Sequence, residues 1–487
     1  MQGFDEPNVP AAKLGEAGLQ TSRRNYNGFN VPTAAPVILG LIMVNADARR
    51  SSVFLRFTDF VRKGAVFGSA LAALSMALCP TVAQAQAQTE PLSQIHIGVI
   101  LPSTSEGTEL DHAVAQAAQQ GVVLATEEFT QNATMFGIDF AVVTAEGEGP
   151  DVIAAAEDLL AGGDVFAIAG GFDTEEGRLL SQWANEKSVP FVNLFASDDR
   201  LRNELCAATS FHVAPSSAMY LDALTSWYVR AGLRNWFVVR GEDEESAAQY
   251  ERLGRALSER HFGAREVGHA VLSPGVGLQD DALDAIASSG ADLVVLLSPA
   301  QDQLDALVRL EKRNLALMVT GFPYAQAQTR AFFAASRDAA PILGVGMRAL
   351  AWESTLDAYG ARELNARYMD RWDQPMESAA WAGYQGIKVL FESAMFSSST
   401  EAEPVLSYLA APSSIFDVWK GIGTSFRPWD HQLRQPLYLS KIDPAATETR
   451  LLGQLVGELP AIYMPGTDPV ERLDQIGDLP GQSKCRL

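Results

Sequence analysis

The sequence predicts an α/β protein with two doubly wound lobes, each built on a parallel sheet with helices on its faces. Apolar runs of strand length alternate with segments of helical period, as βα units require. The alternation occurs in two successive series of segments, which have similar spacing but no repeated sequence. The 487 residues, with a hydrophobic fraction of 47%, are sufficient for two lobes of ordinary domain size.

The first series opens with the apolar run IHIGVILP at 95–102, which ends at a proline and is typical of a buried parallel strand. Apolar and small residues then recur at helical spacing and predict a helix: Val114, Ala117, Gly121, Leu124 and Ala125. Further strands are expected at 140–143, 165–171 and 190–195, and helices at 152–162 and 174–187.

A second series follows the segment FHVAPSSAMY at 211–220. Its expected strands are 235–240, 266–272, 291–298 and 315–320, and its expected helices are 217–231, 246–262, 279–289 and 300–312. Later segments predict strands at 342–352 and 437–442 and helices at 361–372 and 376–396. We therefore expect lobe 1 to comprise 94–213 and 342–410, lobe 2 to comprise 214–341 and 411–445, and a tail, 446–487, to return to lobe 1.

Residues 61–85 have the three parts of a secretory signal peptide in order. Arg62 and Lys63 precede the apolar stretch 64–79, and small residues around Ala85 suit cleavage after that position, with Ala87 as the second choice. The apolar stretch is shorter than the ~20 residues of a membrane span, and Leu78 before Cys79 is too large for a lipoprotein site. Residues 1–60 read as a disordered extension or as the product of a start codon placed too early.

Composition and motifs disfavour several function classes. The net charge of −22 argues against a nucleic-acid partner, because phosphate backbones require a basic surface. No metal-binding motif, phosphate-binding glycine motif or nucleophile elbow occurs, so we expect neither a cofactor nor an enzyme. His212, His261 and His431 have no activated nucleophile near them in sequence, which favours structural roles.

Polar loops follow the strands of both series. Ligands of doubly wound sheets bind beyond the carboxyl ends of the strands, and two facing lobes bring these ends into one cleft. The loops concerned are 102–107, 170–176, 195–199, 241–246 and 322–324. A structural alternative exists for several of them, since Asp173, Ser197 and Ser246 occupy helix N-cap positions and the acids at 242–245 suit a solvated helix start.

The mature chain, about 95–487, resembles the type I periplasmic binding proteins, the family of the leucine/isoleucine/valine-binding proteins. The resemblance rests on the order of the motifs IHIGVILP, GDVFAIAGG, SVPFVNLFAS, FHVAPSS and MESAAWAGYQGIKVLFESA. It implies two lobes joined by three crossovers, hinge closure on a small ligand, a monomer in the periplasm and an inner-membrane ABC permease as partner. The alternative is a sensor or partner-binding protein on the same fold. A polar cleft with donors from both lobes favours transport, and a filled or apolar cleft favours partner binding.

In amino-acid binders of this family, first-lobe loops matching 170–174 and 195–197 hold the ligand carboxylate. Loops matching 243–246, 298–301 and 322–324 hold the ammonium with an acid and aromatic residues. This sequence departs from that pattern, because Asp198 and Asp199 replace a neutral turn and 322–324 lacks the acid. A neutral or cationic solute suits Asp173, Asp198 and Tyr324 better. The candidate ligand-binding residues are Ser103, Thr104, Gly171, Phe172, Asp173, Ala196, Ser197, Asp198, Glu244, Ser246, Ser298, Phe322 and Tyr324.

The segments 416–439 and 473–485 resemble a subgroup of ABC-transporter binding proteins associated with alcohol oxidation dependent on pyrroloquinoline quinone (PQQ). The resemblance implies a link with a PQQ-dependent dehydrogenase system and does not identify the ligand. The residues themselves allow a structural role, in which Arg427, Trp429, Asp430 and Arg434 fix a loop before strand 437–442.

Cleavage after Ala85 leaves two cysteines, Cys206 and Cys485. Two cysteines in an oxidising compartment are usually paired, and this bridge would pin the tail to the first lobe. Two separate buried thiols are the alternative.

Overall fold

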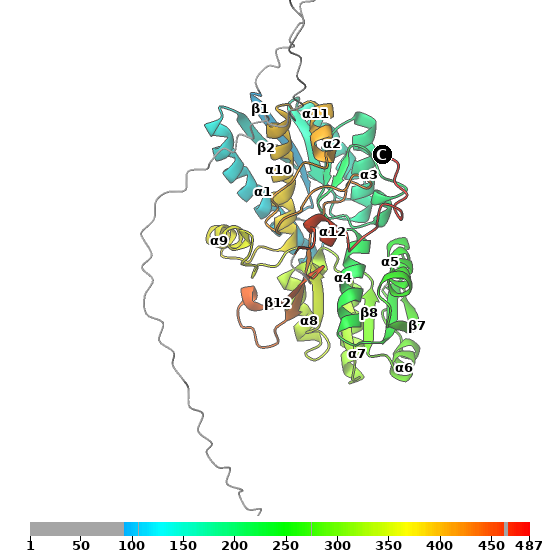
Figure 1. Ribbon diagram of the computed structural model, residues 1–487. Coiled ribbons are helices and arrows are strands. Elements are labelled where there is room, and N and C mark those ends of the chain that lie inside the picture. The colour runs from blue at the N-terminus through cyan, green and yellow to red at the C-terminus, as the bar shows by residue number, and fades with distance from the viewer. Residues whose placement is uncertain (1–91, 106, 274, 462–465) are drawn as a thin grey trace, which may run out of the picture. The chain divides into compact units, whose positions relative to one another are not determined.

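The computed structural model describes residues 92–105, 107–273, 275–461 and 466–487, all of which belong to one compact unit, 87–487 (Figure 1). The expected extension, 1–60, and signal peptide, 61–85, lie outside the described residues.

The first lobe contains a five-stranded parallel sheet in the order β2-β1-β3-β4-β5. Its strands are β1 (Gln94–Leu101), β2 (Asp139–Glu146), β3 (Val165–Gly170), β4 (Phe191–Asn193) and β5 (Ser210–His212). Its helices are α1 (Glu109–Met135), α2 (Asp151–Ala161), α3 (Thr174–Lys187), α10 (Ser378–Ser397) and α11 (Ala402–Ala410). The two faces of β1 pack in different hydrophobic cores. Ile97 and Val99 pack with α1 and α10, whereas Ile100 packs with α2 and α3. Burial on both faces explains the near-continuous apolar run in this strand.

The second lobe contains a four-stranded parallel sheet in the order β7-β6-β8-β9. Its strands are β6 (Asn235–Gly241), β7 (Arg265–Leu272), β8 (Leu293–Leu297) and β9 (Met318–Gly321). Its helices are α4 (Ser217–Arg230), α5 (Glu244–Arg255), α6 (Asp280–Ser288), α7 (Ala300–Lys312) and α8 (Arg330–Ala339). The fold class is therefore the predicted one, with two parallel-sheet lobes, and α8 is an element that the sequence analysis did not identify.

A third, antiparallel sheet joins β10 (Met347–Leu350), β11 (Leu437–Ile442) and β12 (Gly453–Leu459). This arrangement differs from the expected one, which placed 342–352 and the whole of 446–487 in lobe 1. The end of the tail does reach lobe 1, where Cys485 is bonded to Cys206. Ala349, Leu437 and Leu459 share a core with Trp236 of β6, so all three strands pack with the second lobe. The pattern of apolar residues could not predict this sheet, because it does not identify the distant strand with which a short strand pairs.

The chain passes between the two lobes three times. It leaves β5 for α4 through 213–216, and it leaves β10 for α9 (Ala361–Trp372) and α10 through 351–377. It leaves α11 for β11 through the long segment 411–436. These passages match the three crossovers that the resemblance implied. Beyond β12 the chain forms the short helix α12 (Pro469–Leu473) and ends near the first lobe.

Candidate functional site

A cavity of about 300 Å³ lies between the two parallel sheets, at the carboxyl ends of their strands. The first lobe contributes the segments after β3 and β4 and the start of α1, whereas the second contributes the segments after β8 and β9 and the starts of α4 and α5. The lining residues are Thr108, Leu110, Asp111, Phe172, Asp173, Thr174, Phe195, Ala196, Ser197, Tyr220, Glu245, Pro299, Ala300, Gln301, Pro323, Tyr324, Ala325 and Gln326. This is the place where doubly wound sheets bind their ligands.

Local sequence positions the acidic groups of the cavity. Asp173 is the N-cap of α3, and its Oδ1 accepts a hydrogen bond from the Glu176 amide at 2.8 Å. Thr108 and Asp111 form a capping box at the start of α1, in which the Thr108 amide donates to Asp111 at 2.8 Å. Glu245 follows the N-cap Asp243 in the first turn of α5. Each carboxylate therefore stands at a helix start, where the backbone amides favour negative charge.

The three carboxyl groups differ in their tendency to ionise. Burial raises the pKa of Glu245 to about 7, assisted by the charges of nearby aspartates and opposed by a hydrogen bond with Thr174. Desolvation at the cleft also raises the pKa of Asp173, against the hydrogen bonds from backbone amides. Desolvation opposes ionisation of Asp111 as well, but hydrogen bonds from Thr108 and Gln326 lower its pKa overall.

Aromatic rings form much of the remaining wall. Phe172 and Phe195, from the segments after β3 and β4, lie parallel with ring centroids 6.5 Å apart. Tyr324 is hydrogen-bonded through its hydroxyl to the side-chain amide of Gln249 at 2.9 Å. The hydroxyl of Tyr220 accepts from Gln328 Nε2 at 3.0 Å, which restricts the orientation of its ring in the cavity lining. The cavity therefore combines polar and aromatic groups from both lobes.

Direct contacts join the lobes around the cavity. Gln326, in the segment after β9, donates from Nε2 to Asp111 Oδ1 at 2.9 Å. Arg200, beside the first-lobe wall, donates to Asp198 at 2.9 Å and reaches Glu244 on α5 at 2.5 Å. Glu245 is hydrogen-bonded to Thr174 of α3. Polar contacts therefore connect the two lobes beside the cavity.

Residues 94–448 match the family model described as periplasmic binding protein. The chain belongs to the periplasmic binding protein family. Its members are solute-binding proteins rather than enzymes. Comparison of the sequence with curated proteins finds no match.

Solved structures support the fold of this binding protein. A periplasmic binding protein from Burkholderia mallei is 18% identical, with a TM-score of 0.64 over 81% of this chain and 98% of that one. An amino acid ABC transporter substrate-binding protein from Pseudomonas fluorescens Pf-5 is 14% identical, with a TM-score of 0.65 over 82% and 100% of the two chains. An ABC transporter solute-binding protein from R. palustris, in complex with benzoate, is 13% identical, with a TM-score of 0.59 over 81% and 100%.

Five of the residues selected from the sequence lie at the cavity of this binding protein: Phe172, Asp173, Ala196, Ser197 and Tyr324. They come from three loops, two in the first lobe and one in the second. The structure thus brings together candidates that are up to about 150 residues apart in the chain, because the carboxyl ends of the two sheets face one another.

The remaining candidates do not line this cavity. Phe322 and Ser298 are fully buried beside it, and the carbonyl groups of both accept hydrogen bonds from Gln303. Ser246 is buried and donates to Asp243, and Gly171 contributes a carbonyl that accepts from the amides of Phe195 and Ala196. Asp198 is buried beside Arg200, with which it pairs, whereas Ser103 is partly exposed and Thr104 and Glu244 are exposed.

Several lining residues escaped the sequence analysis. Thr108 and Asp111 had a local signal, because Thr-x-x-Asp before a helix is a capping-box pattern. Glu245 belongs to the acidic run 242–245, whose expected solvation holds for its neighbours but not for this partly buried side chain. Gln301 and Gln326 carried no signal of their own, because only the tertiary fold places the start of α7 and the 3-10 turn Gln326–Gln328 at the cavity.

The loop 425–434 has the structural role proposed for its charged and aromatic residues. Arg427 and Arg434 both pair with Asp474 at 2.9 Å, and both guanidinium groups lie over the Trp429 ring. His431 stacks on Phe211 with centroids 4.0 Å apart, and burial lowers the pKa of His431 to about 4. A neutral, stacked imidazole is the expected state of a structural histidine.

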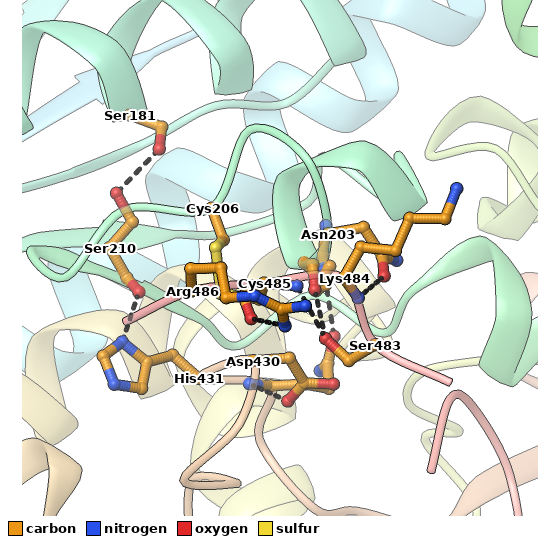
Figure 2. The surroundings of a disulfide bond; sticks show 12 residues. Ser181, Asn203, Cys206, Ser210, Asp430, His431, Ser483, Lys484, Cys485 and Arg486 are labelled. Atoms are coloured by element: carbon orange, nitrogen blue, oxygen red, sulfur yellow. Dashed lines mark hydrogen bonds between the residues drawn. A yellow bond between two sulfur atoms is a disulfide. The ribbon is translucent and has the colours of Figure 1, made fainter. Parts of the chain in front are cut away.

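Cys206 and Cys485 are joined in a disulfide, with a Cα–Cα distance of 5.6 Å (Figure 2). Lys484, next to the second cysteine, donates from its amide to Asn203 Oδ1 at 2.8 Å, as Figure 2 shows. The bridge holds the end of the tail against the first lobe, close to the 3-10 turn Asp199–Arg202 that follows the cavity wall.

Within the described residues, no group of three or more His, Cys, Asp and Glu side chains is arranged to hold a metal ion. No helix in the described part of the chain is long and apolar enough to cross a membrane.

Proposed function

We propose that this protein binds a small polar solute in the cavity between its lobes and delivers it to an inner-membrane ABC permease. The observation that carries the proposal is the cavity itself, which is lined by polar and aromatic groups from both lobes. A ligand that contacts both walls stabilises the closed arrangement over the open one, which is how hinge-closing binding proteins trap their solutes. Polar groups from both lobes in one cavity favour transport over the alternative, a partner-binding protein.

The proposed ligand contacts are the cavity residues that the sequence already indicated, together with Glu245, Tyr220 and Gln301. Phe172, Phe195 and Tyr324 supply apolar contact area, and Glu245 supplies a charged acceptor. The proposed location is the periplasm, since the segment 61–85 has the features of a signal peptide and the family is periplasmic by name. We propose that the protein acts as a monomer. We also propose that the two lobes have the boundaries predicted from the sequence, except that β10 and β12 belong to the second lobe.

A solute screen tests the proposal. The exported chain, purified in oxidising buffer, is heated in the presence of alcohols, aldehydes, carboxylates, amino acids and amines. A solute present at 100 times its dissociation constant stabilises the folded state by about 2.7 kcal/mol, which gives a measurable rise in melting temperature. Failure of every solute class to raise the melting temperature would contradict the proposal. To separate transport from sensing, uptake of the radiolabelled hit is compared in cells with and without this gene.

The link to PQQ-dependent alcohol oxidation is proposed from the resemblance of segments 416–439 and 473–485. If it holds, cells lacking this gene grow more slowly on short-chain alcohols than the parent strain, yet grow normally on the corresponding carboxylic acids. Equal growth of both strains on the alcohols would remove the link while leaving solute binding intact.

A further inference from the structure

All charged side chains that line the cavity in the described part of the chain are acidic. Three carboxyl groups line it, those of Asp111, Asp173 and Glu245, and no Lys, Arg or His lines it in the described part of the chain. Arg200 follows the segment after β4, and its guanidinium is paired with Asp198 and Glu244. An anionic or carboxylate-bearing solute would therefore enter a cavity with like charges on its walls and no cationic partner there.

The carboxylates belong to both lobes. Asp173 begins α3 in the first lobe, and Glu245 lies in the first turn of α5 in the second. The charge of Asp173 acts on Glu245 through space, as does that of Asp198. Closure of the lobes without a ligand therefore brings like charges together, which raises the free energy of the empty closed state. A bound positive charge removes this cost.

The aromatic groups add a second preference. The faces of aromatic rings attract cations, and Phe172, Phe195, Tyr220 and Tyr324 all contribute to the lining. Such an attraction is strongest where water is excluded, and Tyr220 and Phe195 are buried. Carboxylates next to aromatic faces form a set of groups that suits an alkylammonium or arylalkylammonium ion.

We infer that the solute of this cavity is a small organic cation without a carboxylate group, held between Asp173 of the first lobe and Glu245 of the second. The inference rests on the proposed function and names the class of solute for the same site. The same lining disfavours an α-amino acid, because its carboxylate would meet the acidic side chains of Asp111, Asp173 and Glu245 without a cationic partner in the described lining.

Three ligands of nearly equal shape test the charge preference: benzylamine, benzyl alcohol and benzoate, with leucine as a zwitterion. Dissociation constants are measured by titration calorimetry at pH 8 and low ionic strength, using the intact exported chain. We expect benzylamine to bind at least tenfold more tightly than each of the other three. Tighter binding of benzoate, benzyl alcohol or leucine overturns the inference but leaves solute binding standing. If none of the four binds and the broad screen also fails, the proposed function falls with it.

Substitutions at Asp173 and Glu245 test whether these two carboxylates bind the cation. Glu245→Gln and Asp173→Asn remove one negative charge each, and Asn retains the ability to cap α3. Each is expected to weaken benzylamine binding about tenfold or more, because an ionic hydrogen bond is lost, while binding of benzyl alcohol changes little. Glu175→Gln is the control, since Glu175 lies in the same turn as Asp173 but does not line the cavity. Equal effects of Glu175→Gln and Asp173→Asn on benzylamine, or loss of both ligands in Glu245→Gln, would overturn the assignment.

Discussion

At the residue scale, Glu245 has an unusual environment for a side chain in the first turn of a helix. Its helix start favours the charged form, but burial and the charges of Asp198, Asp243 and Asp173 disfavour it. Burial raises the pKa of the Tyr324 hydroxyl, and the charge of Glu245 raises it further. Against desolvation, the pKa of the Arg200 guanidinium is raised mainly by Asp198, with smaller contributions from Glu244 and Glu245. The balance leaves a carboxyl group that titrates near neutral pH inside the cavity.

This titration predicts a pH-dependent contribution to stability. The pKa of Glu245 is about 7 in the folded chain, above its ordinary value of 4.5, so the folded state binds the proton more tightly than the unfolded state. Its contribution is therefore most favourable below about pH 4.5 and is lost as the pH rises to about 7. We expect Glu245→Gln, compared with the parent protein, to gain about 1–2 kcal/mol in unfolding free energy between pH 5 and pH 8. Urea denaturation of both proteins at each pH measures this difference.

The ligand-free state is required in that experiment, because a bound cation would favour the ionised carboxylate. The parent and Glu245→Gln proteins contain the same buried histidines, so their titration cancels in the difference. A difference in unfolding free energy that does not vary between pH 5 and pH 8 would contradict the raised pKa.

At the scale of elements, the close crossing of α1 and α10 shapes the first lobe, as Figure 1 shows from their adjacent ribbons. Gly121 of α1 allows this approach, because a Cβ atom at this position would lie 2.0 Å from the carbonyl oxygen of Ala380. Gly383 of α10 is similar, since its Cβ would lie 2.9 Å from the Ala118 carbonyl oxygen. Two small residues thus set the spacing of the helix pair that covers one face of the first sheet.

We expect Gly121→Ala to lower the unfolding free energy by about 1–3 kcal/mol, despite the better helix propensity of alanine, because the two backbones must move apart. The control is Gly254→Ala in α5, where a new Cβ meets nothing within 4 Å and should be neutral or stabilising by about 0.5–1 kcal/mol. Chemical denaturation of the two variants provides the comparison. Equal stabilities would show that α1 and α10 can separate without cost.

At the scale of the whole described unit, the tail ties together parts of both lobes. Asp474 pairs with two buried arginines of the loop 425–434, and the Gly477 amide donates to Asp222 of α4 at 2.9 Å. Farther on, the disulfide joins Cys485 to Cys206 in the first lobe. The tail therefore contacts a segment between the lobes, a second-lobe helix and a first-lobe turn within a short stretch of chain.

Removing the disulfide should destabilise the protein by about 2–4 kcal/mol, because the bridge restricts the unfolded chain over a sequence separation of 279 residues. The double variant Cys206→Ser/Cys485→Ser is compared with the oxidised parent by urea denaturation. Reducing agent should lower the stability of the parent and leave the double variant unchanged, which controls for effects of the reductant. Two free thiols titrated in the denatured, exported parent would contradict the bridge.

Much of the fold could be predicted from local sequence. Helix α3 (Thr174–Lys187) and helix α9 (Ala361–Trp372) have the expected bounds, and the Asp173 N-cap marks the start of the first of them. The site was only partly predictable. Asp173 and Tyr324 follow strands directly and line the cavity, whereas Thr104 and Ser298 also follow strands but do not. A residue that follows a parallel strand is expected at the carboxyl edge of the sheet. The sequence does not show in which direction its side chain points.

The motifs of the sequence carried the resemblance to the periplasmic binding protein family. By itself the sequence also determined the two parallel-sheet lobes, the order of the cavity loops and the pair of cysteines. These features depend on apolar periodicity, on capping residues and on counting, all of which are local. Only the tertiary structure decided that β10, β11 and β12 form a separate antiparallel sheet and that Glu245, Tyr220 and Gln326 reach the cavity. Both outcomes depend on how distant segments pack, because burial and strand pairing are properties of neighbours in space.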